Sequence, residues 1–203
     1  MSSVSPQSNS ASHTLLASLF WPVGSSSSTS AAFLRNAILV VAGTALLTLS
    51  AKINIPLPYV PMTMQTLVVL MIGAAYGTRL GVATIVAYLA EGALGLPVFA
   101  GPVGGLAPLV GPTAGYLFGF VVAAGAVGWL AERGFDRSVV RLFAAMALGH
   151  AIILGMGFVW LAFGLNLGAE KAWLIGVVPF IAGSLVKNAL GSLMMPMLRR
   201  GMR

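Results

Sequence analysis

The chain has 203 residues, of which 58% are apolar and only 7% are charged. Soluble domains carry about a quarter charged residues, so this composition excludes a soluble enzyme and a disordered protein and predicts a protein that lies in lipid. The absence of cysteine excludes disulfides and thiol chemistry. The net charge of +7 does not indicate a nucleic-acid partner, because Lys and Arg stand near the ends of apolar segments.

The first thirty residues differ in composition from the rest. Twelve of them are Ser, and Ser25 to Ser28 follow one another, which predicts a flexible Ser-rich tail over residues 1–30. Inside it, the apolar segment from Leu15 to Val23 is too short to cross about 30 Å of hydrocarbon. We therefore expect the membrane-embedded domain to occupy residues 31–203.

Six apolar segments of helical length follow, separated by Gly, Pro or charged residues. We expect helices over 33–49, 62–76, 79–94, 113–130 and 139–163, and a last helix that ends at Leu198. The start of this last helix is ambiguous, because Pro179 can separate a short leading segment (172–178) from a helix that begins near Gly183. The predicted fold is all-α: a polytopic, compact bundle of six transmembrane helices with Gly/Pro-rich external loops.

The positions of Lys and Arg predict the orientation in the membrane. With six spans and both termini in the cytoplasm, eight of the eleven lie inside. Lys52 and Lys171 lie outside, and Lys187 falls within a span. We therefore expect a multi-pass protein of the cell membrane with cytoplasmic N- and C-termini.

Two of the external connections are rich in Pro or Gly and yet apolar. Residues 53–61 read INIPLPYVP, and residues 95–112 read GLPVFAGPVGGLAPLVGP. At membrane depth, irregular apolar backbone is tolerated only where it is buried in protein or lines a cavity. We expect these two connections to form a lid over a pocket that opens outward.

Lys187 is the strongest candidate for a functional residue, because a charged side chain inside a span is costly. Ser184, Asn188 and Gly191 share its helical face at spacings of three and four. This pattern predicts the polar wall of an outward pocket. A Lys paired with a structural carboxylate, or one that reaches toward the headgroups, is the alternative interpretation.

Glu91 and His150 are the other ionisable residues in predicted spans. Glu91 ends the third helix, on the same face as Tyr88, and we hypothesise that it faces Lys187 across the pocket; a position at the outer interface remains open. No second His or carboxylate accompanies His150 at helical spacing, which favours a hydrogen bond between helices over a metal site. Gln65 belongs to a polar start of the second helix that either lines the pocket or caps the helix.

The motifs of common enzymes are absent. The sequence contains no GxSxG, HExxH or GxxxxGK[ST]. We therefore expect no catalytic residue, no bound metal, no cofactor and no ATPase site in this chain. Two alternatives remain, a small intramembrane hydrolase that uses Ser184 and His150, and a pore. A pore would need polar residues along all six helices, whereas polarity here gathers at the outer ends.

Four segments in order resemble one known family. They read PMTMQTLVVLMIG (61–73), YLAEGALGLPVFAGP (88–102), GGLAPLVGPTAGYLFGF (104–120) and VPFIAGSLVKNAL (178–190). They are similar to BioY, the biotin-binding S component of energy-coupling-factor (ECF) transporters. The resemblance implies a six-helix protein that binds biotin from outside, together with a transmembrane coupling (T) subunit and two ATPase subunits. Another small vitamin is the alternative ligand.

The resemblance also implies site residues. The last-helix pattern of the family is close to P-G-D-x-x-K, and this chain reads AGSLVK from Ala182 to Lys187. Lys187 matches the base, whereas Ser184 stands at the position of the acid, so Ser184 or Glu91 is expected to contact the ureido group. The complete set of expected biotin-binding residues is Lys187, Ser184, Asn188, Glu91, Tyr88, Phe99, Gln65, Gly111 and Tyr116.

Overall fold

The computed structural model describes residues 29–102 and 104–201. The predicted tail therefore lies outside the described residues, except that Thr29 and Ser30 begin the first helix. The elements in chain order are α2 (Thr29–Lys52), β1 (Asn54–Ile55), β2 (Met62–Thr63), α3 (Gln65–Ala93), α4 (Ala107–Val110), α5 (Ala114–Glu132), η1 (Phe135–Arg137), α6 (Val139–Val159), η2 (Trp160–Gly164), α7 (Ala169–Gly176) and α8 (Val178–Gly201).

Helix α3 reverses direction at Gly77 and so forms a hairpin of two helices. Gly77 has φ 77° and ψ −178°, a conformation that is essentially restricted to glycine. Gln65 and Tyr88 are 23 residues apart, yet Nε2 of Gln65 donates a hydrogen bond to the Tyr88 hydroxyl at 2.6 Å. Along a straight helix the two residues would lie about 35 Å apart. The reversal confirms the predicted division into two helices, although the first begins at Gln65 and not at residue 62.

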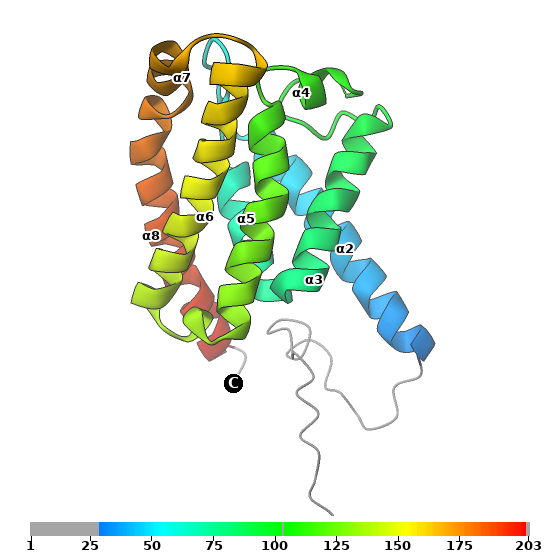
Figure 1. Cartoon of the computed structure of the whole chain (residues 1–203). Helices are drawn as coiled ribbons and strands as arrows, with labels where there is room; N and C mark the ends of the chain where they lie inside the picture. Colours follow the sequence, from blue (N-terminus) through cyan, green and yellow to red (C-terminus); the bar gives the residue numbers. More distant parts are fainter. Residues whose placement is uncertain (1–28, 103, 202–203) are drawn as a thin grey trace, which may run out of the picture.

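The two halves of α3 bring the bundle to six lengthwise segments. Five helical stretches of the described chain are long and apolar enough to cross a membrane, and α3 is one of them. In Figure 1, the start of α2 and the end of α8 lie at the same end of the bundle, as an even number of segments requires. The opposite end carries α4, α7 and the β1–β2 connection. The predicted six-helix membrane fold is confirmed.

The external connections contain structure that the sequence pattern did not predict. Strands β1 and β2 pair antiparallel, with Asn54 opposite Thr63, and α4 forms one helical turn inside the Gly/Pro-rich connection. The start of the last helix, which the sequence left open, lies before Pro179 and not near Gly183. Helix α8 begins at Val178, because Pro179 lies in the first turn, where its missing N–H breaks no intrahelical bond. The short leading segment is the separate helix α7.

Small residues let α3, α5 and α6 approach one another closely. A Cβ atom on Gly73 would lie 2.6 Å from the carbonyl oxygen of Ala124 in α5, and one on Gly119 would lie 3.1 Å from Cα of Ile153 in α6. At the turn of α3, the Glu132 carboxylate accepts hydrogen bonds from the backbone N–H and the hydroxyl of Thr78, at 2.8 and 3.1 Å. A negative charge at a helix N-terminus is favourable, so α5 holds the hairpin turn in place.

Candidate functional site

A cavity of about 280 Å³ lies between the helices, beneath the two external connections. Helices α3, α5, α6 and α8 form its walls. The residues that line it are Val60, Pro61, Thr63, Gln65, Thr66, Phe99, Ala100, Gly101, Pro108, Thr113, Tyr116, Leu117, Phe120, His150, Ile153, Leu154, Phe180, Ser184 and Lys187. Its volume is close to the lower end of the range for small-molecule sites, about 300–1,000 Å³.

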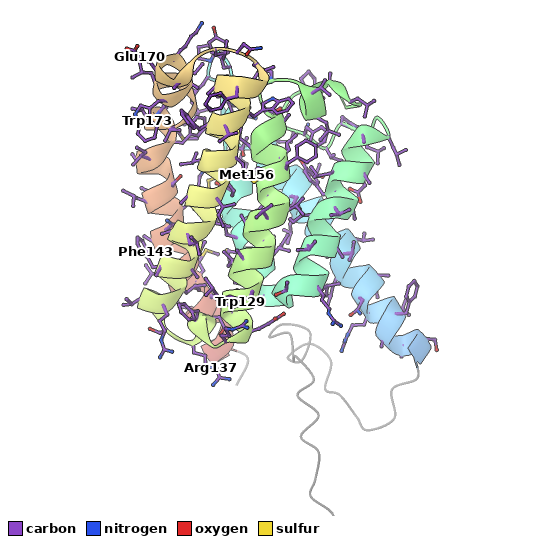
Figure 2. All side chains as sticks on the ribbon, viewed as in Figure 1. Trp129, Arg137, Phe143, Met156, Glu170 and Trp173 are labelled. Carbon is purple, nitrogen blue, oxygen red and sulfur yellow. The ribbon has the colours of Figure 1, made fainter. Side chains whose placement is uncertain are left out.

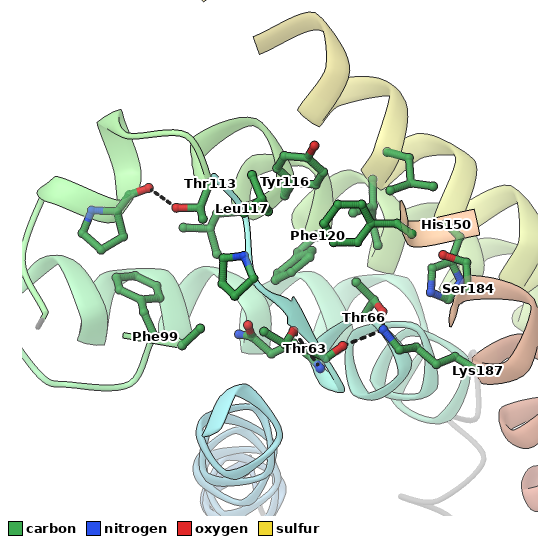
Figure 3. A pocket seen from close by; sticks show the side chains of 18 of the residues that line it. Thr63, Thr66, Phe99, Thr113, Tyr116, Leu117, Phe120, His150, Ser184 and Lys187 are labelled. Carbon is green, nitrogen blue, oxygen red and sulfur yellow. Dashed lines mark hydrogen bonds between the residues drawn. The ribbon is translucent and has the colours of Figure 1, made fainter. Parts of the chain in front are cut away.

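The lining is largely apolar, and three of its polar residues, His150, Ser184 and Lys187, lie together on one side (Figure 3). Lys187 is the only residue with a formal charge among the lining residues. Figure 3 shows His150, Ser184 and Lys187 at one end of the view and Phe99 at the other. An apolar cavity with a few convergent polar groups is the usual form of a small-molecule site. It suits a ligand with a polar group at one end and an apolar body.

Lys187 is buried and faces the cavity. Ser184, Lys187 and Asn188 lie on one face of α8 at the predicted helical spacing. All three are buried, so this face points into the bundle. The ammonium Nζ donates to the carbonyl oxygen of Thr63 at 2.5 Å and to the Thr66 hydroxyl at 3.1 Å, where β2 leads into α3. Lys187 therefore neither reaches toward headgroups nor pairs with Glu91, and the hypothesis that those two side chains neutralise each other is not supported.

His150 connects α6 to α8 and also lines the cavity. Its Nδ1 lies 2.7 Å from Oδ1 of Asn188 and 3.3 Å from the carbonyl oxygen of Met146. This confirms the predicted hydrogen bond between helices. Nε2 is buried and has no hydrogen-bond partner among the described residues. The sequence pattern did not place His150 in the pocket, because helical spacing alone does not show which face of α6 meets α8.

Gln65, Tyr88 and Phe99 form one connected group. Gln65 lines the cavity and donates to the Tyr88 hydroxyl, which in turn donates to the carbonyl oxygen of Val98 at 2.8 Å. The rings of Tyr88 and Phe99 meet edge to face, with centroids 5.5 Å apart. Tyr88 is fully buried and lies behind the lining, so it fixes Gln65 and the Phe99 segment.

The structure divides the nine expected binding residues into two groups. Lys187, Ser184, Gln65, Phe99 and Tyr116 line the cavity, and Asn188, Tyr88, Gly111 and Glu91 do not. Asn188 and Tyr88 hydrogen-bond to lining residues instead. The carbonyl oxygen of Gly111 accepts a hydrogen bond from Nε1 of Trp160 at 2.9 Å, which joins the end of the second connection to η2.

Both external connections contribute to the cavity, in agreement with the predicted lid. Val60 lines it from the first connection, and Phe99 and Gly101 line it from the second. The Lys52 ammonium at the end of α2 donates to the carbonyl oxygens of Phe99 and Gly101, at 2.7 and 3.0 Å. The sequence pattern indicates only that Lys52 lies at the outer end of a span, since a contact across 47 residues leaves no local pattern.

The arrangement does not support the hydrolase alternative. Nδ1 of His150 is engaged with Asn188, and Nε2 has no partner, so the described chain shows no hydrogen bond through which His150 would activate Ser184. Among the described residues, His, Asp and Glu form no group of three that would suit a metal ion.

Comparisons with known proteins agree on one family. The model of the BioY family matches residues 23–203. A probable biotin transporter BioY from Pyrococcus horikoshii is 38% identical over 151 residues, which cover 74% of this chain and 88% of the relative. The biotin transporter BioY of Thermotoga maritima is 39% identical over 150 residues, which cover 74% of this chain and 87% of that one.

A solved structure shares the fold as well. The crystal structure of the S component for biotin from an ECF-type ABC transporter superposes with a TM-score of 0.75. The two chains are 25% identical, and the match covers 86% of this chain and 95% of the other.

Proposed function

This chain belongs to the BioY family, and on that premise we propose that it takes up biotin as the membrane-embedded S component of an ECF-type transporter. The curated relatives are biotin transporters, and the similar solved structure is an S component for biotin. The cavity beneath the external connections is the proposed binding site. The observation that carries the proposal is the buried Lys187 ammonium in the wall of a largely apolar cavity, whose other described lining residues carry no formal charge.

Biotin suits such a cavity chemically. It has an apolar ring system and an aliphatic chain, with a ureido group at one end and a carboxylate at the other. Lys187 has only donors, so it is proposed to donate to the ureido oxygen, and the Ser184 hydroxyl to complete the polar end. Phe99 and Tyr116 are proposed to pack against the apolar body. Tyr88 supports Phe99 from behind through the edge-to-face contact of their rings.

The cavity end of the bundle is proposed to face the outside. Figure 2 shows Arg137 at the end of the bundle opposite Glu170. Most Lys and Arg residues of the chain belong to the end that carries Arg137, and the positive-inside rule places such an end in the cytoplasm. In this orientation the lid faces the outside, from which biotin would enter, and the end of α8 lies on the cytoplasmic side.

Coupling of transport to nucleotide hydrolysis would require subunits other than this chain. No nucleotide-binding motif is present, so the proposed partners are a transmembrane coupling subunit and two ATPase subunits. Purification of the tagged chain from its native membrane is expected to recover these subunits. Biotin uptake by the chain alone in liposomes, without ATP, would contradict the need for them.

Binding of labelled biotin to the purified chain in detergent tests the function. Saturable binding is expected, with unlabelled biotin as a competitor and a series of other small vitamins as controls. Stronger competition by another vitamin would assign the protein to that ligand. Because no hydrolysis is proposed, biotin is expected to remain chemically unchanged after incubation with the unaltered chain. The same result is expected with the Ser184→Ala variant.

A further inference from the structure

The unpartnered nitrogen of His150 is a feature that the proposed contacts above do not use. The side chain is 3% exposed, it lines the cavity, and Nε2 has no hydrogen-bond partner among the described residues. Buried polar atoms are nearly always hydrogen-bonded, and leaving one unpaired costs stability. A buried polar atom without a partner, on a side chain that lines a binding cavity, points to a partner on the ligand.

The contacts of Nδ1 determine what Nε2 can do. Nδ1 faces two oxygen atoms, the side-chain oxygen of Asn188 and the carbonyl oxygen of Met146. The Met146 carbonyl is an obligatory acceptor, so Nδ1 carries the hydrogen. A neutral imidazole has a single N–H, and Nε2 is then an acceptor. A second cation beside Lys187 in this apolar cavity would be costly, which favours the neutral ring.

We infer that His150 accepts a hydrogen bond from a ureido N–H of the ligand and thereby selects a cyclic urea, with Asn188 as the residue that positions its ring. This inference rests on the proposed function and adds a specificity-determining residue to it. Lys187 donates only, and the Ser184 hydroxyl both donates and accepts. Nε2 of His150 is the group that is committed to accept, so it distinguishes an N–H from an oxygen at the same place.

Two analogues of biotin test the acceptor directly. In each, one ureido N–H is replaced with a ring oxygen, which keeps the shape and turns a donor into an acceptor. The unaltered protein is expected to bind one of the two about 10- to 100-fold more weakly than biotin, because a buried acceptor loses its partner. Equal binding of biotin and both analogues would overturn the inference.

The His150→Phe variant keeps a ring of similar size and removes the acceptor. It is expected to bind biotin about 10- to 100-fold more weakly and to lose the discrimination between biotin and that analogue. Leu148→Phe, on an exposed position of the same helix, is the matched control and is expected to retain both properties. Discrimination that persists in His150→Phe would overturn the role of His150.

Nitrogen NMR of the imidazole tests the tautomer without altering the site. The chain has two His residues, so a His13→Gln background leaves the signals of His150 alone. Nδ1 is expected to be protonated and Nε2 unprotonated, and biotin is expected to shift the Nε2 signal. In Asn188→Ala only the longer contact to the Met146 carbonyl, at 3.3 Å, holds the hydrogen on Nδ1, so the other tautomer is expected to appear in part and the shift of the Nε2 signal on addition of biotin to become smaller. A hydrogen on Nε2, or an Nε2 signal that biotin leaves unchanged, would overturn the inference.

These outcomes separate the inference from the function on which it rests. If the unaltered chain does not bind biotin, the proposed function fails and the inference fails with it. If the unaltered chain binds biotin and His150→Phe binds it equally well, the proposed function stands and the role of His150 is refuted.

Discussion

Lys187 is a charge held inside an apolar bundle, and its neighbours explain how it is tolerated. The ammonium has two oxygen partners, Thr63 and Thr66, where β2 leads into α3. A buried cation is acceptable only when it is paired or hydrogen-bonded, and these two acceptors leave one of its three donors free. That free donor is the group that a ligand oxygen would meet.

The Lys187→Ala variant is expected to lose most biotin binding. Removing one partner of a buried, charged hydrogen bond costs about 2–5 kcal/mol, or about 30-fold or more in affinity. Titration with labelled biotin measures the loss, and size-exclusion chromatography in detergent checks that the variant still folds. Affinity close to that of the unaltered chain would refute the proposed role.

Glu91 is expected to contribute little to binding, in contrast to the expectation from the sequence. It does not line the cavity, and Lys187 has other partners. Glu91→Gln should therefore change the biotin affinity by no more than about twofold, as is usual for substitutions away from such a site. A loss of tenfold or more, measured in the same titration, would show that the carboxylate supplies the missing acid after all.

At the scale of the elements, Lys52 connects α2 to the Gly/Pro-rich connection that covers the cavity. It donates to the carbonyl oxygens of Phe99 and Gly101, two residues of that connection that line the cavity. Because the connection has little regular structure of its own, hydrogen bonds from the end of a helix restrict the motion of the connection. The contact makes Lys52 a candidate for control of ligand release.

The Lys52→Met variant is expected to release biotin faster. The two hydrogen bonds are partly exposed, and their loss is expected to raise the dissociation rate by about two- to tenfold. Dissociation of labelled biotin after dilution measures the rate, and Lys52→Arg, which keeps the cation and its donors, is the control. An unchanged dissociation rate in Lys52→Met would show that the hydrogen bonds of Lys52 do not keep the connection over the cavity.

Gly77 is the element-scale feature on which the α3 hairpin depends. Its conformation is essentially restricted to glycine, so Gly77→Ala is expected to lower the free energy of unfolding by about 1–3 kcal/mol. Thermal unfolding in detergent measures the change. Gly155→Ala is the matched control, because a Cβ there meets nothing within 4 Å and the helical backbone suits alanine. Equal stability of the two variants would contradict the hairpin.

At the scale of the whole molecule, the two ends of the bundle differ in what they carry. One end carries α4, α7 and the connections that line the cavity, and the other carries the α3 turn and the end of α8 (Figure 1). Only the orientation in the membrane decides whether the cavity receives biotin from outside. The absence of cysteine makes this orientation easy to measure.

Single cysteines at the two ends test the orientation. Glu170→Cys, at the cavity end, is expected to react with a membrane-impermeant maleimide in intact cells. Arg137→Cys, at the opposite end, is expected to react only after the cells are permeabilised (Figure 2). Cysteine-free unaltered protein is the background control. The reverse pattern would invert the proposed topology.

The sequence by itself determined the membrane location, the division into six helical segments and the two apolar external connections. These features follow from local composition and from the length of apolar stretches, which neighbouring residues in the chain set. The helical spacing of Ser184, Lys187 and Asn188 likewise placed them on one inward face. Of these, Ser184 and Lys187 line the cavity, whereas Phe99 and Tyr116, which also line it, were expected from the family resemblance and not from spacing.

Only the tertiary structure decided which of these faces meet. Lys187 and Thr63 are 124 residues apart, His150 and Asn188 are 38 apart, and Lys52 and Phe99 are 47 apart. No local pattern encodes such pairs, because they depend on how the helices pack and on the reversal at Gly77. Packing therefore brought His150 to the cavity and left Glu91 outside its lining.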